Sequence, residues 1–113
     1  MTDGLKRSLL LKLGLVRRAG LAVIGQDRIR AEISAGKAPF LLFLSNDASS
    51  AVERRFLSAA AKRGDRVVHL ESVSRWELGA ALGLASAQVV GLPMASQFAE
   101  MLLEDLRREG DVI

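Results

Sequence analysis

The chain has 113 residues, of which 50% are hydrophobic and 26% are charged, as in an ordinary globular domain. It contains no cysteine and one histidine, which excludes disulfides, thiolate metal sites, cysteine nucleophiles and multi-histidine metal sites. The net charge is +3, but residues 1–66 hold 13 Lys/Arg and 6 Asp/Glu, whereas residues 67–113 hold 3 and 7. Most basic residues are arginine, which suits bidentate contacts with phosphate and guanine. This asymmetry favours a polyanionic partner on one side of the molecule, although charges that merely solvate helices give the same composition.

The length suits one folding unit, so we expect a single domain spanning residues 1–113. No stretch reaches the roughly 18–20 apolar residues that a membrane-spanning helix needs. The N-terminus, Met1-Thr2-Asp3-Gly4, lacks the basic-then-apolar order of a signal peptide. We therefore expect a cytoplasmic protein with no membrane partner.

Helical and strand-like segments alternate along the chain. Apolar residues at helical spacing predict helices over residues 5–19 and 26–35, between Ser50 and Gly64, between Ser74 and Gly83, and over residues 95–108. Short apolar runs predict strands over residues 21–24, 40–44, 67–70 and 88–92. The run 40–44 does not alternate with polar residues, which is typical of a strand buried on both faces. This order predicts the α/β class, as a three-layer α/β/α sandwich with a four-stranded mixed sheet.

Two serines are expected to cap the helices that follow them. Ser50 stands three residues before Glu53, and Ser74 three residues before Glu77, which is the spacing of a capping box. The residues expected to face inward are Leu5, Leu9, Leu13 and Val16 in the first helix, Val52, Phe56, Leu57 and Ala60 in the third, and Phe98, Met101, Leu102 and Leu106 in the last. The carboxylates of the last helix are interpreted as a solvated face: Glu100, Glu104, Asp105 and Glu109.

No pattern of residues indicates an enzyme. His69 lies inside an apolar strand, where a packed or exposed histidine is expected rather than a member of a Ser-His-Asp triad. The chain has no Gly-x-Ser-x-Gly elbow, no Walker-type phosphate loop and no Gly-x-Gly-x-x-Gly after a strand. Trp76 is interpreted as an anchor for its helix rather than a base-stacking platform. We expect no catalytic residue, no metal or other cofactor, and no small-molecule substrate.

The junction at residues 24–30 is a candidate anion site. Gly25 precedes a helix whose first N–H groups and dipole favour an anion, and Arg28 and Arg30 follow within about a turn. An ordinary glycine turn followed by a solvated helix is the alternative. Gly79 is unusual in a different way, because a glycine inside a helix costs about 1 kcal/mol against alanine. We expect a close backbone approach at Gly79.

Three blocks of sequence follow the order and spacing of a known family. They are residues 13–25 (LGLVRRAGLAVIG), 36–50 (GKAPFLLFLSNDASS) and 78–83 (LGAALG). Together they resemble the L-seven-Ae/L-thirty-e superfamily of ribosomal proteins, above all its small bacterial members encoded beside translation and ribosome-maturation genes. The resemblance covers about residues 5–105. It implies an α/β/α sandwich that binds RNA, typically kink-turns, which are internal loops bent sharply around sheared G·A pairs.

In that family the RNA is held by the residues after the first strand, with the usual pattern Gly-Thr-Asn-Glu-x-x-Lys. Gly25 matches this pattern, whereas Asp27 replaces the asparagine, Arg28 the glutamate and Ala31 the lysine. A second family contact is an apolar loop before the last strand, here at residues 84–86. The residues that we assign to RNA are Gly25, Gln26, Asp27, Arg28, Arg30, Arg17, Arg18, Lys37, Leu84 and Ala85.

We therefore expect a non-catalytic protein that binds structured RNA, kink-turn-like or ribosomal, in ribosome function or maturation, with ribosomal or maturation proteins as further partners. One alternative is a protein-interaction module of a ribosome-associated complex without direct RNA readout. Another is the substrate-binding part of an RNA-modifying enzyme whose catalytic half is supplied by another chain.

Overall fold

Helices and strands alternate along the chain in a computed structural model, which describes residues 2–36 and 39–108, the side chains of residues 58–63 excepted. The elements are α1 (Asp3–Arg18), β1 (Val23–Ile24), α2 (Gln26–Ser34), β2 (Phe40–Leu44), α3 (Ser50–Arg63), β3 (Arg66–His69), α4 (Arg75–Ala81), β4 (Val89–Pro93) and α5 (Gln97–Arg108). All of the predicted elements are present, within three residues at each end. The first strand is shorter than predicted, with two residues instead of four.

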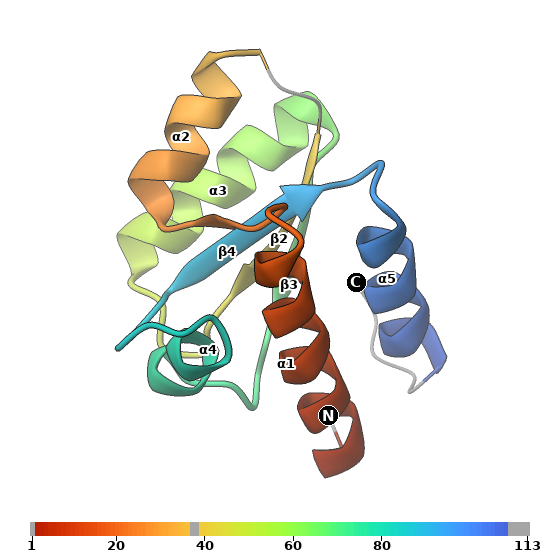
Figure 1. Cartoon of the computed structure of the whole chain (residues 1–113). Helices are drawn as coiled ribbons and strands as arrows, with labels where there is room; N and C mark the ends of the chain where they lie inside the picture. Colours follow the sequence, from red (N-terminus) through yellow and green to blue (C-terminus); the bar gives the residue numbers. More distant parts are fainter. Residues whose placement is uncertain (1, 37–38, 109–113) are drawn as a thin grey trace.

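The four strands form one sheet in the order β1-β4-β2-β3. β2 and β3 are parallel, whereas β4 is antiparallel to both of its neighbours, β1 and β2. The sheet is therefore mixed, as predicted. The last strand of the chain occupies an interior position and covers the inner edge of β1 (Figure 1).

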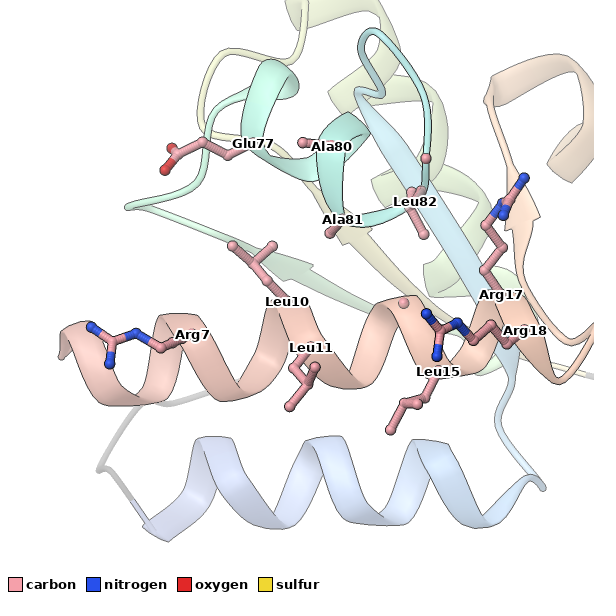
Figure 2. Close-up of a pocket in the computed structure, with 12 residues that line it drawn as sticks. Arg7, Leu10, Leu11, Leu15, Arg17, Arg18, Glu77, Ala80, Ala81 and Leu82 are labelled. Carbon is pink, nitrogen blue, oxygen red and sulfur yellow. The ribbon is translucent and has the colours of Figure 1, made fainter.

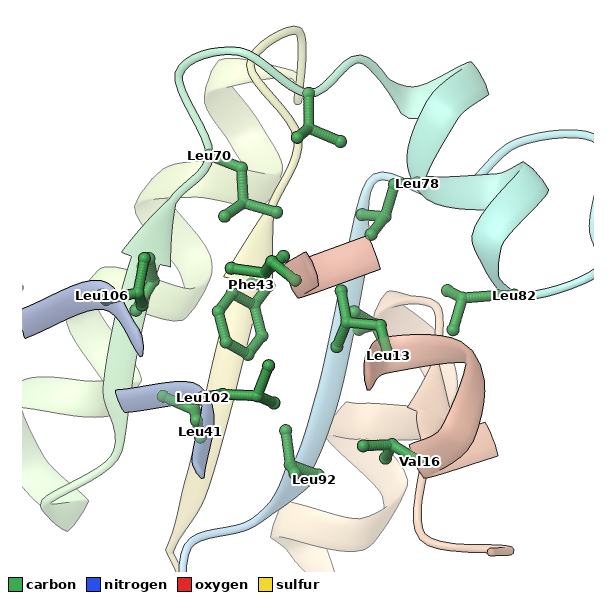
Figure 3. Close-up of a cluster of buried hydrophobic side chains, with 14 of the residues drawn as sticks. Leu13, Val16, Leu41, Phe43, Leu70, Leu78, Leu82, Leu92, Leu102 and Leu106 are labelled. Atoms are coloured by element: carbon green, nitrogen blue, oxygen red, sulfur yellow. The ribbon is translucent and has the colours of Figure 1, made fainter. Parts of the chain in front are cut away.

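Helices cover both faces of this sheet, which gives three layers. Figure 1 shows α1 and α5 on one face and α2 and α3 on the other. The side chains of β2 alternate between these layers: Leu41 and Phe43 pack with α1, α4 and α5 (Figure 3), and Leu42 and Leu44 pack on the opposite face. All four are fully buried. Burial on both faces explains why residues 40–44 show no polar alternation.

One of the two predicted caps is correct. Ser74 caps α4 through reciprocal hydrogen bonds with Glu77. The cap of α3 is Ser49, not Ser50: its Oγ accepts a hydrogen bond of 3.2 Å from the N–H of Val52, and Ser50 is already helical. The N–H of Ser49 in turn donates to Oε1 of Gln88 at 2.9 Å.

The predicted inward-facing residues are buried at the centre of each helix face, but some at the edge of a face are exposed. The core stripe of α1 is buried as predicted, as are Val52, Phe56, Leu102 and Leu106. Leu57 and Met101 are exposed, because each lies beside its buried stripe rather than within it. The Ala60 side chain and Glu109 lie outside the described residues.

Two polar or aromatic side chains also differ from expectation. Asp105 is buried beside Lys12 and does not belong to a solvated face. Trp76 is largely exposed, so it does not anchor the start of α4, which the Ser74 capping box fixes instead. None of the helices in residues 2–36 and 39–108 is both long and apolar enough to cross a bilayer.

Candidate functional site

The start of α2 is the first feature of the candidate site. Gly25 has φ 89° and ψ 151°, a conformation that is essentially restricted to glycine. Its N–H donates to the carbonyl of Val89 at 3.1 Å, and its carbonyl accepts from the N–H of Ile29 at 3.1 Å. No side chain caps the helix. The first turn of α2 therefore relies on groups outside the helix to satisfy its N–H donors, and its dipole favours an anion.

The loop between α4 and β4 is the second feature. A Cβ on Gly79 would lie 2.5 Å from the Cα of Ser86, so the loop backbone is packed directly on α4, as predicted. Backbone hydrogen bonds from Leu84 to Gly79 at 2.8 Å and from Ala87 to Arg75 at 2.9 Å hold both ends of the loop. Leu84 and Ala85 remain exposed between these attachments. The loop thus presents an apolar tip on a firmly held backbone.

These two features line one cavity of about 450 Å³. Residues 24–28 form one side, and residues 86–89 form another. The antiparallel pairing of Ile24 with Val90 explains this neighbourhood, because it brings the end of β1 beside the start of β4. Two segments about 60 residues apart therefore meet at one place. Of the loop residues 84–86 that the resemblance implies, Ser86 lines the cavity, whereas Leu84 and Ala85 lie outside its lining.

The predicted arginines do not all lie at this cavity. Arg28 lines it, whereas Arg30 is exposed two residues further along α2 and is not among the lining residues. Arg17 lies against the turn that begins the loop, because a Cβ on Gly83 would be 3.5 Å from its guanidinium carbon. Arg18 lines a separate groove between α1 and α4. Lys37 lies outside the described residues.

Asp27 is the acidic member of the predicted set. It is exposed in the first turn of α2, where the helix dipole stabilises a negative charge. It also lines the cavity. Its carboxylate therefore occupies a position that an incoming phosphate would also favour.

Two residues of this region were missed by the sequence analysis. Arg55 on α3 donates a hydrogen bond from Nη1 to Oε1 of Gln26, which adds a cation beside the start of α2. Gln88 lines the cavity and joins β4 to the cap of α3 through Ser49. The sequence places Arg55 off the apolar face of its helix, but it does not reveal which helix lies next to it.

His69 and the acidic residues are the candidates for a catalytic or metal site in the described part of the chain. His69 is exposed, and its Nε2 lies 3.9 Å from a carboxylate oxygen of Glu53. This confirms the expectation of an exposed or packed histidine on a strand. Among residues 2–36 and 39–108, no three His, Asp or Glu side chains are grouped so that they could hold a metal ion.

No protein-family model matches the chain. No curated protein matches it either. Its fold is similar to that of a Bacillus halodurans protein of unknown function, with a TM-score of 0.77 and 25% identity over 88% of this chain and 96% of the other. It is also similar to a 15.5 kD RNA-binding protein from Giardia lamblia, with a TM-score of 0.73 and 18% identity over 99% of this chain and 93% of the other. These likenesses establish the α/β fold.

Proposed function

We propose that this chain is a non-catalytic protein that binds structured RNA at the cavity between the start of α2 and the α4–β4 loop. The observation that carries the proposal is that the start of α2 and the end of the α4–β4 loop, which the family resemblance implies at residues 25–31 and 84–86, meet at one cavity, lined by residues 24–28 and by Ser86. The similarity of the fold to an RNA-binding protein of Giardia lamblia supports it further. The start of α2 has no side-chain cap and lies beside Arg28 and Arg55, which suits a phosphate group, and these cations offset the Asp27 carboxylate in the same turn.

Within this proposal the contacts divide into two kinds. Phosphates dock on the first turn of α2, held by Arg28 and by Arg55, while Gln26 faces base edges. Leu84 and Ala85 pack against a base extruded from the RNA. The remaining predicted cations extend the positive field around the site: Arg17, Arg18, Arg30 and Lys37. We propose kink-turn-like or ribosomal RNA as the ligand, bound in the cytoplasm during ribosome function or maturation.

The affinity for structured RNA is expected to fall steeply with salt, because bound arginines release counterions from the phosphates. For about four phosphate contacts, the dissociation constant should rise roughly a hundredfold between about 50 and 200 mM salt. The measurement is a titration of a bulged RNA hairpin at several salt concentrations. Arg28→Gln should reduce the salt slope by about one contact, whereas Arg107→Gln on α5 should leave it unchanged.

A flat salt dependence, or no binding at low salt, would contradict RNA binding and favour the protein-interaction alternative. Equal effects of the two glutamine variants would show that overall charge, rather than the start of α2, determines the affinity.

Weak binding of a standard kink-turn is expected, because two family contacts are replaced in this chain. An ionised Asp27 only accepts hydrogen bonds, so it cannot donate to the guanine acceptors that asparagine reaches. Ala31 supplies no cation in place of lysine. The double variant Asp27→Asn, Ala31→Lys should therefore bind the kink-turn at least about tenfold more tightly, since each good base contact contributes about 1–3 kcal/mol.

This comparison requires a kink-turn and a straight duplex of equal length. The gain should be confined to the kink-turn. If the natural chain already binds the kink-turn tightly and selectively, the interpretation of Asp27 is wrong. An equal gain on both RNAs would mean that added charge alone explains the change.

A further inference from the structure

The helix α1 has a second apolar stripe that the fold does not bury. Its core stripe, which ends at Val16, is packed against the sheet. On the opposite face Leu11 is 68% exposed and Leu15 is 39% exposed, one helical turn apart. A surface helix ordinarily carries polar residues there. Two leucines in this position therefore require an explanation other than the folding of this chain.

Arginines stand at both ends of this stripe. Arg7 precedes Leu11 by one turn, and Arg18 follows Leu15 by about one turn, so the four side chains lie on one face of α1. Figure 2 shows Arg7 and Arg18 at the two ends with Leu11 and Leu15 between them. The distance along the helix from the first arginine to the second is about 16 Å, or three turns.

The stripe forms one wall of a groove of about 740 Å³ between α1 and α4. The floor is made of small and apolar residues, among them Gly14 and Ala81, where a Cβ on Gly14 would lie only 3.1 Å from the Ala81 carbonyl oxygen. The two helices pack closely at this point, and Leu11 and Leu15 also line the groove. Apolar residues at helical spacing are the anchors by which one helix binds another, so the groove suits a helix laid along α1.

The charge of the groove is positive. Arg7, Arg17 and Arg18 line it, and Glu77 is its one acidic residue among those described. The carboxylate of Glu77 is held by Lys6 at 2.5 Å, and the hydrogen bond from Lys6 is the main cause that lowers the pKa of this carboxyl. Because Glu77 is already paired, the three arginines are not neutralised by it. The groove therefore attracts negative charge at its rim and apolar side chains at its centre.

We propose that this groove binds an acidic amphipathic helix from a partner protein. Two apolar residues one turn apart pack on Leu11 and Leu15, and carboxylates about one turn outside them pair with Arg7 and Arg18. The groove does not share lining residues with the cavity at the start of α2, but Arg17 and Arg18 also belong to the positive field proposed for RNA. Arg7 and Leu11 do not belong to the proposed RNA contacts, so the test relies on these two residues. The exposed leucines favour a protein helix over RNA as the ligand of this groove, because leucine side chains form no hydrogen bond with a phosphate backbone.

The test is a selection from a displayed library of helical peptides of about 16 residues, enough to cover the stripe. The natural chain is the target, and the Leu11→Glu variant serves for counter-selection. Enriched peptides should carry two apolar residues at a spacing of three or four, flanked by Asp or Glu. The best peptide should lose at least about tenfold in affinity for Leu11→Glu and for Arg7→Glu.

Matched controls lie on α3, on the other side of the sheet. Leu57, which is 43% exposed, and the exposed Arg54 receive the same substitutions, and each should change peptide affinity by less than about twofold. Leu11→Glu should also leave the affinity for the bulged hairpin within about twofold, so a failure here is distinguishable from a failure of RNA binding. Circular dichroism verifies that each variant is folded.

Three outcomes would overturn the proposal. The proposal of an acidic partner helix would be wrong if basic or uncharged peptides were enriched, or if no enriched peptide depended on Leu11 for binding. A loss of RNA affinity in Leu11→Glu would assign the groove to RNA. Self-association of the natural chain that Leu11→Glu abolishes in sedimentation would mean that a second copy covers the stripe.

Discussion

Replacing Gly79 with alanine is expected to lower the free energy of unfolding by about 1–3 kcal/mol, although alanine is the better helix former. The added Cβ would lie 2.5 Å from the Cα of Ser86 and 2.7 Å from its nitrogen. These are backbone atoms, and they cannot move aside as the end of a flexible side chain does. Either α4 or the loop must shift, and the hydrogen bond from Leu84 to the Gly79 carbonyl would be disturbed in the process.

Urea unfolding of the natural chain and the Gly79→Ala variant measures this effect. Gly4→Ala in α1 is the matched control, because nothing lies within 4 Å of a Cβ at Gly4. The control should be neutral or stabilised by up to about 1 kcal/mol, as expected from helix propensity alone. Because Ser86 lines the proposed RNA cavity, Gly79→Ala should also weaken hairpin binding. If Gly79→Ala were stabilised as much as Gly4→Ala, the loop would be able to move away from α4 at no cost in free energy, and the prediction would be wrong.

The second large effect concerns Asp105, whose side chain is 7% exposed between α1 and α5. Lys12 donates to Oδ2, Arg108 donates to Oδ1 at 2.6 Å, and the Ser8 hydroxyl lies 3.4 Å from Oδ2. Asp105→Ala leaves Lys12 without its partner in a mostly enclosed place. The loss should be about 2–3 kcal/mol of unfolding free energy at neutral pH.

The effect should depend on pH in a defined direction. The hydrogen bond from Lys12 is the main cause that holds the pKa of Asp105 below its ordinary value; burial opposes this shift, and Arg108 adds to it. A carboxyl with a lowered pKa in the folded state stabilises the fold above its unfolded pKa, near 4, and loses this contribution as the pH falls through the folded value. The difference between natural chain and variant should therefore be full at pH 7 and shrink below about pH 4.

Glu104→Ala provides the comparison for this measurement. Glu104 is 59% exposed and pairs with Arg107 at 3.6 Å on the same helix. Its removal should change the unfolding free energy by less than about 1 kcal/mol, because water screens an exposed pair. If both variants lose the same small amount, or if the loss at Asp105 is independent of pH, the buried pair does not stabilise the contact between α1 and α5.

Local signals in the sequence were sufficient for most of the fold. The unbroken run Phe40–Leu44 indicated burial on two faces, and the Ser74–Glu77 spacing gave a true capping box. Both signals depend only on near neighbours in the chain. At α3 the local rule was wrong: Ser50 has the capping-box spacing and Ser49 does not, yet Ser49 is the cap, and its N–H donates to the distant Gln88.

The wrong or missed predictions also involve contacts between residues that are distant in the sequence. Asp105 follows helical spacing among other carboxylates, so its pattern resembles a solvated face. Its partner Lys12 lies 93 positions away, and only the packing of α1 on α5 brings the two together. Arg55 could not be assigned to the site from the sequence for the same reason, because its partner Gln26 lies on another helix, α2. For the candidate site, the assignment of RNA contacts stays a prediction; the cavity at the start of α2 and the place of Arg18 in a separate groove required the fold.

The interior position of β4 has a consequence for how the protein matures. Among the strands of residues 2–36 and 39–108, β1 pairs with β4 alone, through the pairs Val23–Gly91 and Ile24–Val90. During synthesis, residues 25–88 are made after β1 and before β4, so β1 cannot join the sheet until late. The hydrogen bond from Gly25 to Val89, which fixes the start of α2, forms only at that late stage. A nascent or truncated chain that lacks β4 therefore has neither the partner strand of β1 nor the hydrogen bond that fixes the start of α2, so it cannot form the cavity proposed to bind RNA.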